Sequence, residues 1–189
     1  AKEVFIEKGS DGARMQEIAD RAGINKSLLH YYYRSKEKLF GAIFKFAFKS
    51  FLPKLTNVFN EDDDIFTQIR NFISIYIDLI SKNPFIPMFI INEVNRKQTG
   101  FVTEVIKMVG IQPELFRAQI RREIEKGTIR SIDPNQLIVN TLAMCLFPFI
   151  GRPIIQIVLF DSKKEDYDEF LATRKAEVAD FIINSIRKV

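Results

Sequence analysis

The hydrophobic positions along this chain recur at the spacing of α-helices, and no run of segments shows the alternation that strands require. Met15, Ile18, Ala19 and Ala22 follow the spacing i, i+3, i+4, i+7, which puts them on one face of a short helix. Similar spacing continues to the end of the chain. The pattern therefore predicts an all-α fold.

Residues that cap or break helices divide this pattern into segments. Asn25 and Ser35 are positioned to cap a short and a long helix, and Asp133 followed by Pro134 is a helix start with proline at the first helical position. Between Gly151 and Asp161 we expect an irregular connection. The helices predicted in this way cover residues 1–8, 15–22, a short stretch after Asn25, a long stretch after Ser35, 65–80, a stretch from 84 or 87 to about 97, 101–109, 113–126, 134–150 and 164–187.

The composition allows a substantial core and narrows the chemistry. Hydrophobic residues make up 47% of the 189 residues, and the aromatic residues are 18 Phe and 5 Tyr with no Trp. The chain has one cysteine, Cys145, and one histidine, so it forms no internal disulfide and has too few soft ligands for a zinc site. We expect a reducing, cytoplasmic location and no metal or other cofactor.

The longest apolar stretch does not indicate a membrane protein. It runs from Leu137 to Gly151 and stops at Arg152, short of the roughly 20 residues that a spanning helix needs. We interpret it as a buried helix and expect no membrane partner. Because the first helical pattern is already under way at Ala1, we also expect residues to be missing before it.

The positive charge of the chain is concentrated near its start. Residues 1–50 contain ten Lys or Arg and six Asp or Glu, whereas residues 51–189 contain 18 of each sign. The whole net charge of +4 therefore lies in the first quarter of the chain. A basic segment joined to a neutral one indicates that an anionic partner docks at the N-terminal end, although a chance imbalance on a solvated surface is an alternative.

Residues 13–33 carry the most specific pattern: two short helices joined by a tight turn that contains a glycine, which is typical of a helix-turn-helix. Ala19 and Ala22 are small enough to let the helices cross closely, and Gly23 permits a turn conformation that a Cβ would oppose. The second helix can enter the DNA major groove by its N-terminal end. Its predicted outward residues are Lys26, Ser27, His30 and Tyr31, and its predicted inward residues are Ile24, Leu29 and Tyr33.

Three segments in this region resemble the signature of the TetR/AcrR regulators. They are residues 5–10 (Phe-Ile-Glu-Lys-Gly-Ser), 17–24 (Glu-Ile-Ala-Asp-Arg-Ala-Gly-Ile) and 31–40 (Tyr-Tyr-Tyr-Arg-Ser-Lys-Glu-Lys-Leu-Phe). The resemblance implies a three-helix DNA-binding domain over residues 1–48 and a helical regulatory and dimerisation domain over residues 49–189. It also implies a homodimer that binds a palindromic DNA operator as a transcription regulator, most simply a ligand-responsive repressor.

Carried over residue by residue, the resemblance assigns DNA contacts to Lys26, Ser27, His30 and Tyr31. Tyr32 and Lys36 are expected to hold the DNA backbone. The sequence departs from the family pattern at Arg14, which lies where the family often has a capping Ser or Thr. We expect Arg14 to make the phosphate contact instead. His30 stands where the family usually has Tyr, which predicts a different contact at that position.

For the second domain, the resemblance implies an internal pocket for a small apolar or amphipathic effector, although plain core packing is the alternative for each candidate. The candidate pocket residues are Phe72, Tyr76, Phe89, Phe101, Met108, Phe116, Met144 and Phe147. The two C-terminal helices carry more apolar surface than one domain face needs, and in the family such helices form the dimer interface. The candidate interface residues are Phe170, Val178, Phe181 and Ile182.

Other functions remain as alternatives. An enzyme is disfavoured, because the single His lies in the helix-turn-helix, the single Cys lies in an apolar helix, and no glycine-rich phosphate loop is present. A helical small-molecule-binding protein that has lost DNA binding is another alternative, which the intact face from Lys26 to Lys36 disfavours. The sequence does not exclude an activator.

Overall fold

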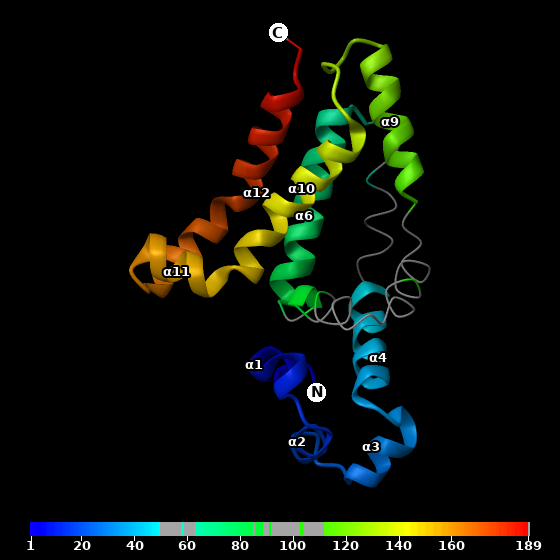
Figure 1. The fold of residues 1–189 in the computed structure, drawn as a ribbon, viewed down its shortest axis with the longest axis vertical. Helices are drawn as coiled ribbons and strands as arrows, with labels where there is room; N and C mark the ends of the chain where they lie inside the picture. The colour runs from blue at the N-terminus through cyan, green and yellow to red at the C-terminus, as the bar shows by residue number, and fades with distance from the viewer. Residues whose placement is uncertain are drawn as a thin grey trace. The chain divides into compact units, whose positions relative to one another are not determined.

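A computed structural model describes residues 1–49, 58, 63–84, 86–88, 91, 103 and 112–188 (Figure 1). The described elements are helices, which confirms the predicted all-α class, and the one β contact among them is an isolated bridge between Ile129 and Arg187. The helices are α1 (Lys2–Gly12), α2 (Met15–Arg21), α3 (Lys26–Tyr33), α4 (Lys36–Lys49), α6 (Ile65–Lys82), α9 (Pro113–Glu125), α10 (Pro134–Ile150), α11 (Arg152–Phe160) and α12 (Lys164–Ile186).

The chain forms two compact units. The first combines Ala1–Leu52 with Lys82–Gly110, and the second combines Pro53–Ser81 with Ile111–Val189. These units differ from the two continuous domains, 1–48 and 49–189, that the sequence predicted. The physical reason is visible at Ile86, which lies far along the chain but is buried in the same core as Phe5 and Phe40 of the first unit.

The core of the first unit is small and built around an aromatic pair. The rings of Phe5 in α1 and Phe40 in α4 meet edge to face, with centroids 5.3 Å apart and planes at 88°. Ile18 and Ala19 of α2 and Leu29 of α3 bury their side chains in the same cluster. This core fixes the positions of α3 and α4, which carry the predicted DNA-binding residues from Lys26 to Lys36.

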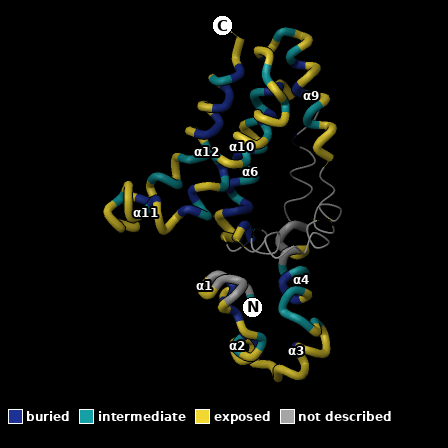
Figure 2. The backbone as a smooth tube through the Cα atoms, in the orientation of Figure 1, coloured by how far each residue is buried: buried dark blue, intermediate teal, exposed yellow. Residues whose placement is uncertain are grey.

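In the second unit, α6, α9, α10 and α12 share a larger core, whose buried positions are dark blue in Figure 2. Ile73 and Ile77 of α6, Cys145 of α10 and Val178 of α12 belong to this cluster. Two ion pairs connect α6 to α12 at its edge, Lys175 to Asp78 at 2.7 Å and Arg70 to Asp180 at 2.6 Å. The side chains of both pairs are about half exposed, so each pair contributes little and the apolar core supplies most of the stability.

Several predicted helix boundaries are confirmed and two predictions are wrong. Asp133 caps α10, because its side chain accepts a hydrogen bond from the Asn135 amide at 2.8 Å. The first helix continues through Gly9 to Gly12. The region from Gly151 to Asp161 is not irregular: α11 fills it, because Pro153 lies in the first turn of that helix, where no amide hydrogen is needed.

The joint between α10 and α11 is sharp. The axes of the two helices differ by 78°, and only when taken together do they reach the length and hydropathy of a membrane span. No single helix in the described part of the chain does so.

α11 and the first turns of α12 form a helical hairpin, called here the α11 hairpin (residues 152–170). Its turn is tight, with positive φ at Asp161 and Ser162. Inside the hairpin, the ring of Phe160 packs on those of Tyr167 and Phe170 at centroid distances of 5.9 and 5.4 Å. Together these contacts show that the hairpin has an internal core of its own.

Tyr167 ties this hairpin to α10. Its ring is fully buried, and its hydroxyl donates a hydrogen bond to the carbonyl oxygen of Pro148 at 2.6 Å. Replacing Tyr167 by Phe is expected to lower the free energy of unfolding by about 1–2 kcal/mol, because one buried hydrogen bond is lost. In thermal unfolding this corresponds to a fall in Tm of roughly 3–6 °C. The exposed Tyr32→Phe is the matched control, and an unchanged Tm in Tyr167→Phe would contradict the assignment.

Candidate nucleic-acid interface

The turn between α2 and α3 has the geometry of a helix-turn-helix. Gly23 adopts a φ of +65°, and its amide donates to the Asp20 carbonyl at 3.1 Å. The Ile24 amide then reaches back to the Ala19 carbonyl at 3.0 Å. The predicted role of Gly23 is confirmed, because residues with a Cβ rarely adopt this conformation.

Two packing predictions near this turn are wrong. Ala22 is exposed, because it follows the last residue of α2 as the C-cap of that helix, where the chain already turns away. Ile24 is also exposed, because it lies in the link before α3. The contact between the two helices therefore rests on Ile18, Ala19 and Leu29, all of which are buried.

The structure places the predicted DNA-contacting side chains on the solvent-exposed side of α3. Lys26, Ser27 and His30 are exposed, and Tyr31 leaves 77% of its surface open to solvent. Asn25 caps the helix as predicted, because its side chain accepts a hydrogen bond from the Ser27 amide at 2.8 Å. The exposed side of α3 thus presents a cation and a hydroxyl at a capped helix start, and an imidazole one turn further along.

The imidazole of His30 contacts the end of its own helix. Its Nδ1 lies 3.2 Å from the carbonyl oxygen of Arg34, to which it can donate a hydrogen bond. This arrangement leaves Nε2 as the other hydrogen-bonding atom of the ring. Tyr31 and Tyr32, which follow His30 in the sequence, are both exposed. Their rings meet edge to face, with the centroids 5.3 Å apart.

Charge pairing in the first unit is uneven. On α1 and α2, the carboxylates of Glu7 and Glu17 are neutralised by Arg21 and Lys8, with Lys8 and Glu17 2.8 Å apart. The two hydrogen bonds from Arg21 hold the pKa of Glu7 below its usual value. The cations near α3 differ, since Arg14, Lys26 and Arg34 form no ion pair with any described residue.

Beyond α3, the chain enters α4 through a second capped helix start. The Ser35 side chain accepts a hydrogen bond from the Lys38 amide at 3.2 Å, and Lys36 begins the helix with a partly exposed side chain. Arg34, which the sequence reasoning did not single out, ends α3 with a φ of 50° and is exposed. A helix N-terminus flanked by cations is suited to a phosphate group.

In the second unit, the structure brings together part of the predicted effector pocket. Phe72 and Tyr76 stack at a centroid distance of 5.7 Å, and Phe116 meets Phe72 edge to face at the same distance. Burial raises the pKa of Tyr76 to about 12, so its hydroxyl stays neutral. Phe89, Phe101 and Met108 lie outside the described residues. Phe147 does not join this cluster, because 56% of its surface is exposed.

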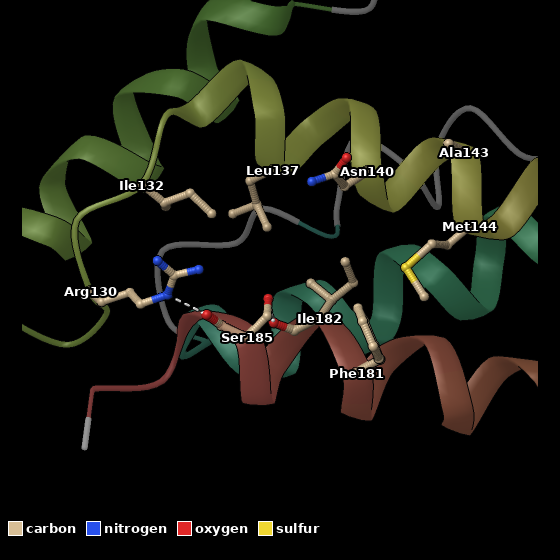
Figure 3. Close-up of a pocket in the computed structure, with 9 residues that line it drawn as sticks. All are labelled: Arg130, Ile132, Leu137, Asn140, Ala143, Met144, Phe181, Ile182 and Ser185. Carbon is tan, nitrogen blue, oxygen red and sulfur yellow. Dashed lines mark hydrogen bonds between the residues drawn. The ribbon is translucent and has the colours of Figure 1, made fainter.

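A separate groove of about 340 Å³ lies between α10, α12 and the segment before α10 (Figure 3). Arg130 closes one end, and its side chain donates to the Ser185 carbonyl. Among the predicted pocket residues that the structure describes, only Met144 lines it, next to the predicted interface residues Phe181 and Ile182. The groove is therefore distinct from the Phe72 cluster.

Two of the four predicted interface residues cannot reach a second chain. Val178 and Ile182 are buried in the core of their own unit, because they lie on the side of α12 that faces α6 and α10. Phe181 is exposed, because it lies at the edge of that buried side, and Phe170 is half-buried beneath Arg174. Of the four, only Phe181 and part of Phe170 can contact a partner.

The first 43 residues match the family model described as bacterial regulatory proteins, tetR family. That family consists of regulators and not of enzymes. Among curated proteins, the transcriptional regulator RutR of Escherichia coli K12 is 26% identical over 138 residues, which is 73% of this chain. The matched region spans 65% of the length of RutR.

Solved structures show the same fold at low sequence identity. The TetR family regulator PfmR from Thermus thermophilus is similar at a TM-score of 0.66 and 18% identity, covering 93% of this chain and 94% of PfmR. AibR, solved with isovaleryl coenzyme A and operator DNA, is similar at a TM-score of 0.63 and 22% identity, covering 78% of this chain and 80% of AibR. The fold thus extends beyond the N-terminal match.

Proposed function

We propose that this chain, which belongs to the tetR family of bacterial regulatory proteins, is a transcription regulator that binds double-stranded DNA through α3. The observation that carries the proposal is the exposed face of α3. It holds Lys26, Ser27, His30 and Tyr31 on a helix that Ile18, Ala19 and Leu29 fix against the core. The nearby cations that have no carboxylate partner among the described residues are attracted to the phosphate backbone.

In this proposal the contacts divide into two kinds. α3 enters the major groove by its N-terminal end, so that Lys26, Ser27 and, one turn further along, His30 reach base edges or the flanking phosphates. The remaining groups hold the DNA backbone and set the register of the helix. These are the side chains of Arg14, Tyr31, Tyr32, Arg34 and Lys36 together with the N-terminus of α4.

We further propose that the regulator acts as a homodimer on a palindromic operator. α10 contains no charged residue, and its exposed side chains include Val139, Ala143 and Phe147. An exposed helix face without charge is suited to association, and the groove beside Phe181 continues this surface. Two-fold symmetry would present two copies of α3 about one DNA turn, roughly 34 Å, apart.

The effector part of the proposal rests on the aromatic cluster of Phe72, Tyr76 and Phe116. These rings offer an apolar wall with one neutral hydroxyl, which fits a small apolar or amphipathic ligand. AibR was solved with both an acyl coenzyme A and operator DNA, which supports ligand control in this fold. A ligand acts as an inducer of a repressor only if it binds the DNA-free state more tightly.

The test is selection of genomic fragments by the full-length protein at low salt, followed by sequencing of the bound fraction. We expect a small set of enriched fragments that share an inverted repeat. A reporter gene placed behind that repeat then distinguishes repressor from activator, with repression expected. Uniform recovery of all fragments at low salt would contradict sequence-specific binding, since phosphate contacts alone do not select sequence.

A further inference from the structure

α3 carries an exposed leucine among the side chains that face solvent. Leu28 is the third residue of this helix and leaves 45% of its surface open. Its neighbour Leu29 is buried in the core of the first unit. The sequence reasoning assigned no role to Leu28. A single exposed leucine is ordinary on a protein surface, so its meaning depends on where it lies.

The core side of α3 determines where Leu28 lies around the helix axis. Leu29 is buried, and Tyr33 packs against the same core. At about 100° per residue, Leu28 lies about 100° from Leu29 and about 140° from Tyr33. Tyr31 and Tyr32, which follow Leu28 at the spacings i+3 and i+4, are both exposed. Leu28, Tyr31 and Tyr32 therefore form one open side of the helix, and Leu28 is the member nearest its N-terminus.

The first turn of α3 is the part that the proposed binding mode brings deepest into the major groove. Asn25 caps this end of the helix, and Lys26 and Ser27 lie exposed beside Leu28. A cation and a hydroxyl can bind phosphates or polar base edges. A leucine can do neither, and covering a phosphate with it would remove water from a charged group without offering a hydrogen bond in return.

The major groove offers one clearly apolar group to such a side chain. The edges of guanine, cytosine and adenine present hydrogen-bond donors and acceptors there, whereas thymine adds a C5-methyl group beside its O4 acceptor. Contact between an apolar side chain and this methyl group removes apolar surface of both partners from water. The chemistry of Leu28 at this position therefore fits a thymine.

We propose that Leu28 is a specificity-determining residue that packs on the C5-methyl group of a thymine in the operator half-site. The inference rests on the proposed DNA binding by α3 and names one base that this helix selects. Cytosine at the same position would present no methyl group to Leu28. A purine there would present polar atoms that the leucine cannot satisfy.

Contact of Leu28 with deoxyribose is the alternative within the same complex. A sugar contact adds affinity at any sequence, because every nucleotide carries the same sugar. A methyl contact adds affinity only where thymine is present. The two contacts therefore differ in their response when the methyl group is removed from the DNA.

The test removes the methyl group from the DNA and the leucine side chain from the protein. In an operator fragment obtained by selection, each thymine of one half-site is replaced in turn by deoxyuridine, which pairs in the same way but lacks the methyl group. By fluorescence anisotropy at fixed salt, one replacement is expected to weaken binding of the full-length wild type about 4-fold, the worth of one buried methyl group. Leu28→Ala is expected to weaken binding to the unmodified operator about 10-fold and to respond no further to that replacement.

Two control variants show whether the lost response is specific to Leu28. Lys26→Ala weakens binding through its charge and is expected to keep the full response to deoxyuridine. Leu115→Ala changes an exposed leucine of α9 in the second unit and is expected to match the wild type in both affinity and response. Because Leu28 lies outside the buried core cluster, Leu28→Ala should also keep the wild-type Tm within about 2 °C.

A second measurement needs no modified base. Selection of operator fragments from a randomised library is carried out in parallel with the wild type and with Leu28→Ala. We expect Leu28→Ala to recover the same repeat with the preference for thymine relaxed at one position in each half-site. Retention of that preference at every position would overturn the proposal.

The outcomes separate this inference from the function on which it rests. A wild type that binds equally well after each single replacement overturns the methyl contact and leaves DNA binding by α3 in place. A deoxyuridine effect of equal size in the wild type and in Leu28→Ala overturns the role of Leu28, because the methyl group then acts through another residue or through the shape of the DNA. Failure of the wild type to select any fragment overturns the proposed function and this inference together.

Discussion

Replacing Lys26 and Tyr31 together by alanine is expected to weaken binding to a selected operator fragment by about 100-fold or more. Each base or phosphate contact of this kind is worth about 1–3 kcal/mol, and both side chains lie exposed on α3 without an internal packing role. The stability of the protein should be unchanged for the same reason. Fluorescence anisotropy with a labelled fragment at fixed salt measures the change.

Single variants show how much of the lost affinity comes from the charge of Lys26 and how much from the ring of Tyr31. Lys26→Ala alone is expected to make the slope of log affinity against log salt concentration shallower by about 1, the change for one lost phosphate contact. Tyr31→Phe removes only the hydroxyl and is expected to fall between the wild type and Tyr31→Ala. Lys163→Ala, an exposed lysine of the second unit, serves as the control. Equal affinity of the double variant and the wild type would contradict the claim that α3 contacts the DNA.

Replacing Phe40 by alanine is expected to destabilise the first unit by about 3–5 kcal/mol. Phe40 is fully buried and meets Phe5 edge to face, so its removal leaves a cavity that the small core cannot close. A loss of this size approaches the whole stability of a small unit. Hydrogen exchange followed by mass spectrometry should therefore show rapid exchange over α2 and α3, together with weaker DNA binding.

The same helix provides the control for this prediction. Phe46 also lies on α4, but 81% of its surface is exposed. Phe46→Ala is expected to change the stability by no more than about 0.5 kcal/mol. Slow exchange over α2 and α3 in Phe40→Ala, as in the wild type, would mean that the Phe5–Phe40 contact does not hold the first unit together.

The sequence was sufficient to predict features that depend on local chemistry. Asn25, Ser35 and Asp133 were expected to cap helices, and each side chain accepts the predicted kind of hydrogen bond. Gly23 was expected in a turn and has a positive φ. The exposed side of α3 also follows from its periodicity once Leu29 is placed inside.

Features that depend on tertiary packing were harder to predict. α12 has apolar residues on two sides, and adjacent positions such as Phe181 and Ile182 differ by about 100° around the axis. Only the packing against α6 and α10 shows that Ile182 faces the core and Phe181 faces solvent. The α11 helix was missed because an irregular connection was expected between Gly151 and Asp161, although Pro153 fits the first turn of a helix.

The central claim is that two copies of α3 bind one DNA duplex with two-fold symmetry. Hydroxyl-radical footprinting of the full-length protein on a selected operator fragment tests it most directly. We predict two equivalent protected patches, related by a dyad and centred about one helical turn, roughly 34 Å, apart. A single protected patch, or protection without symmetry, would contradict the account.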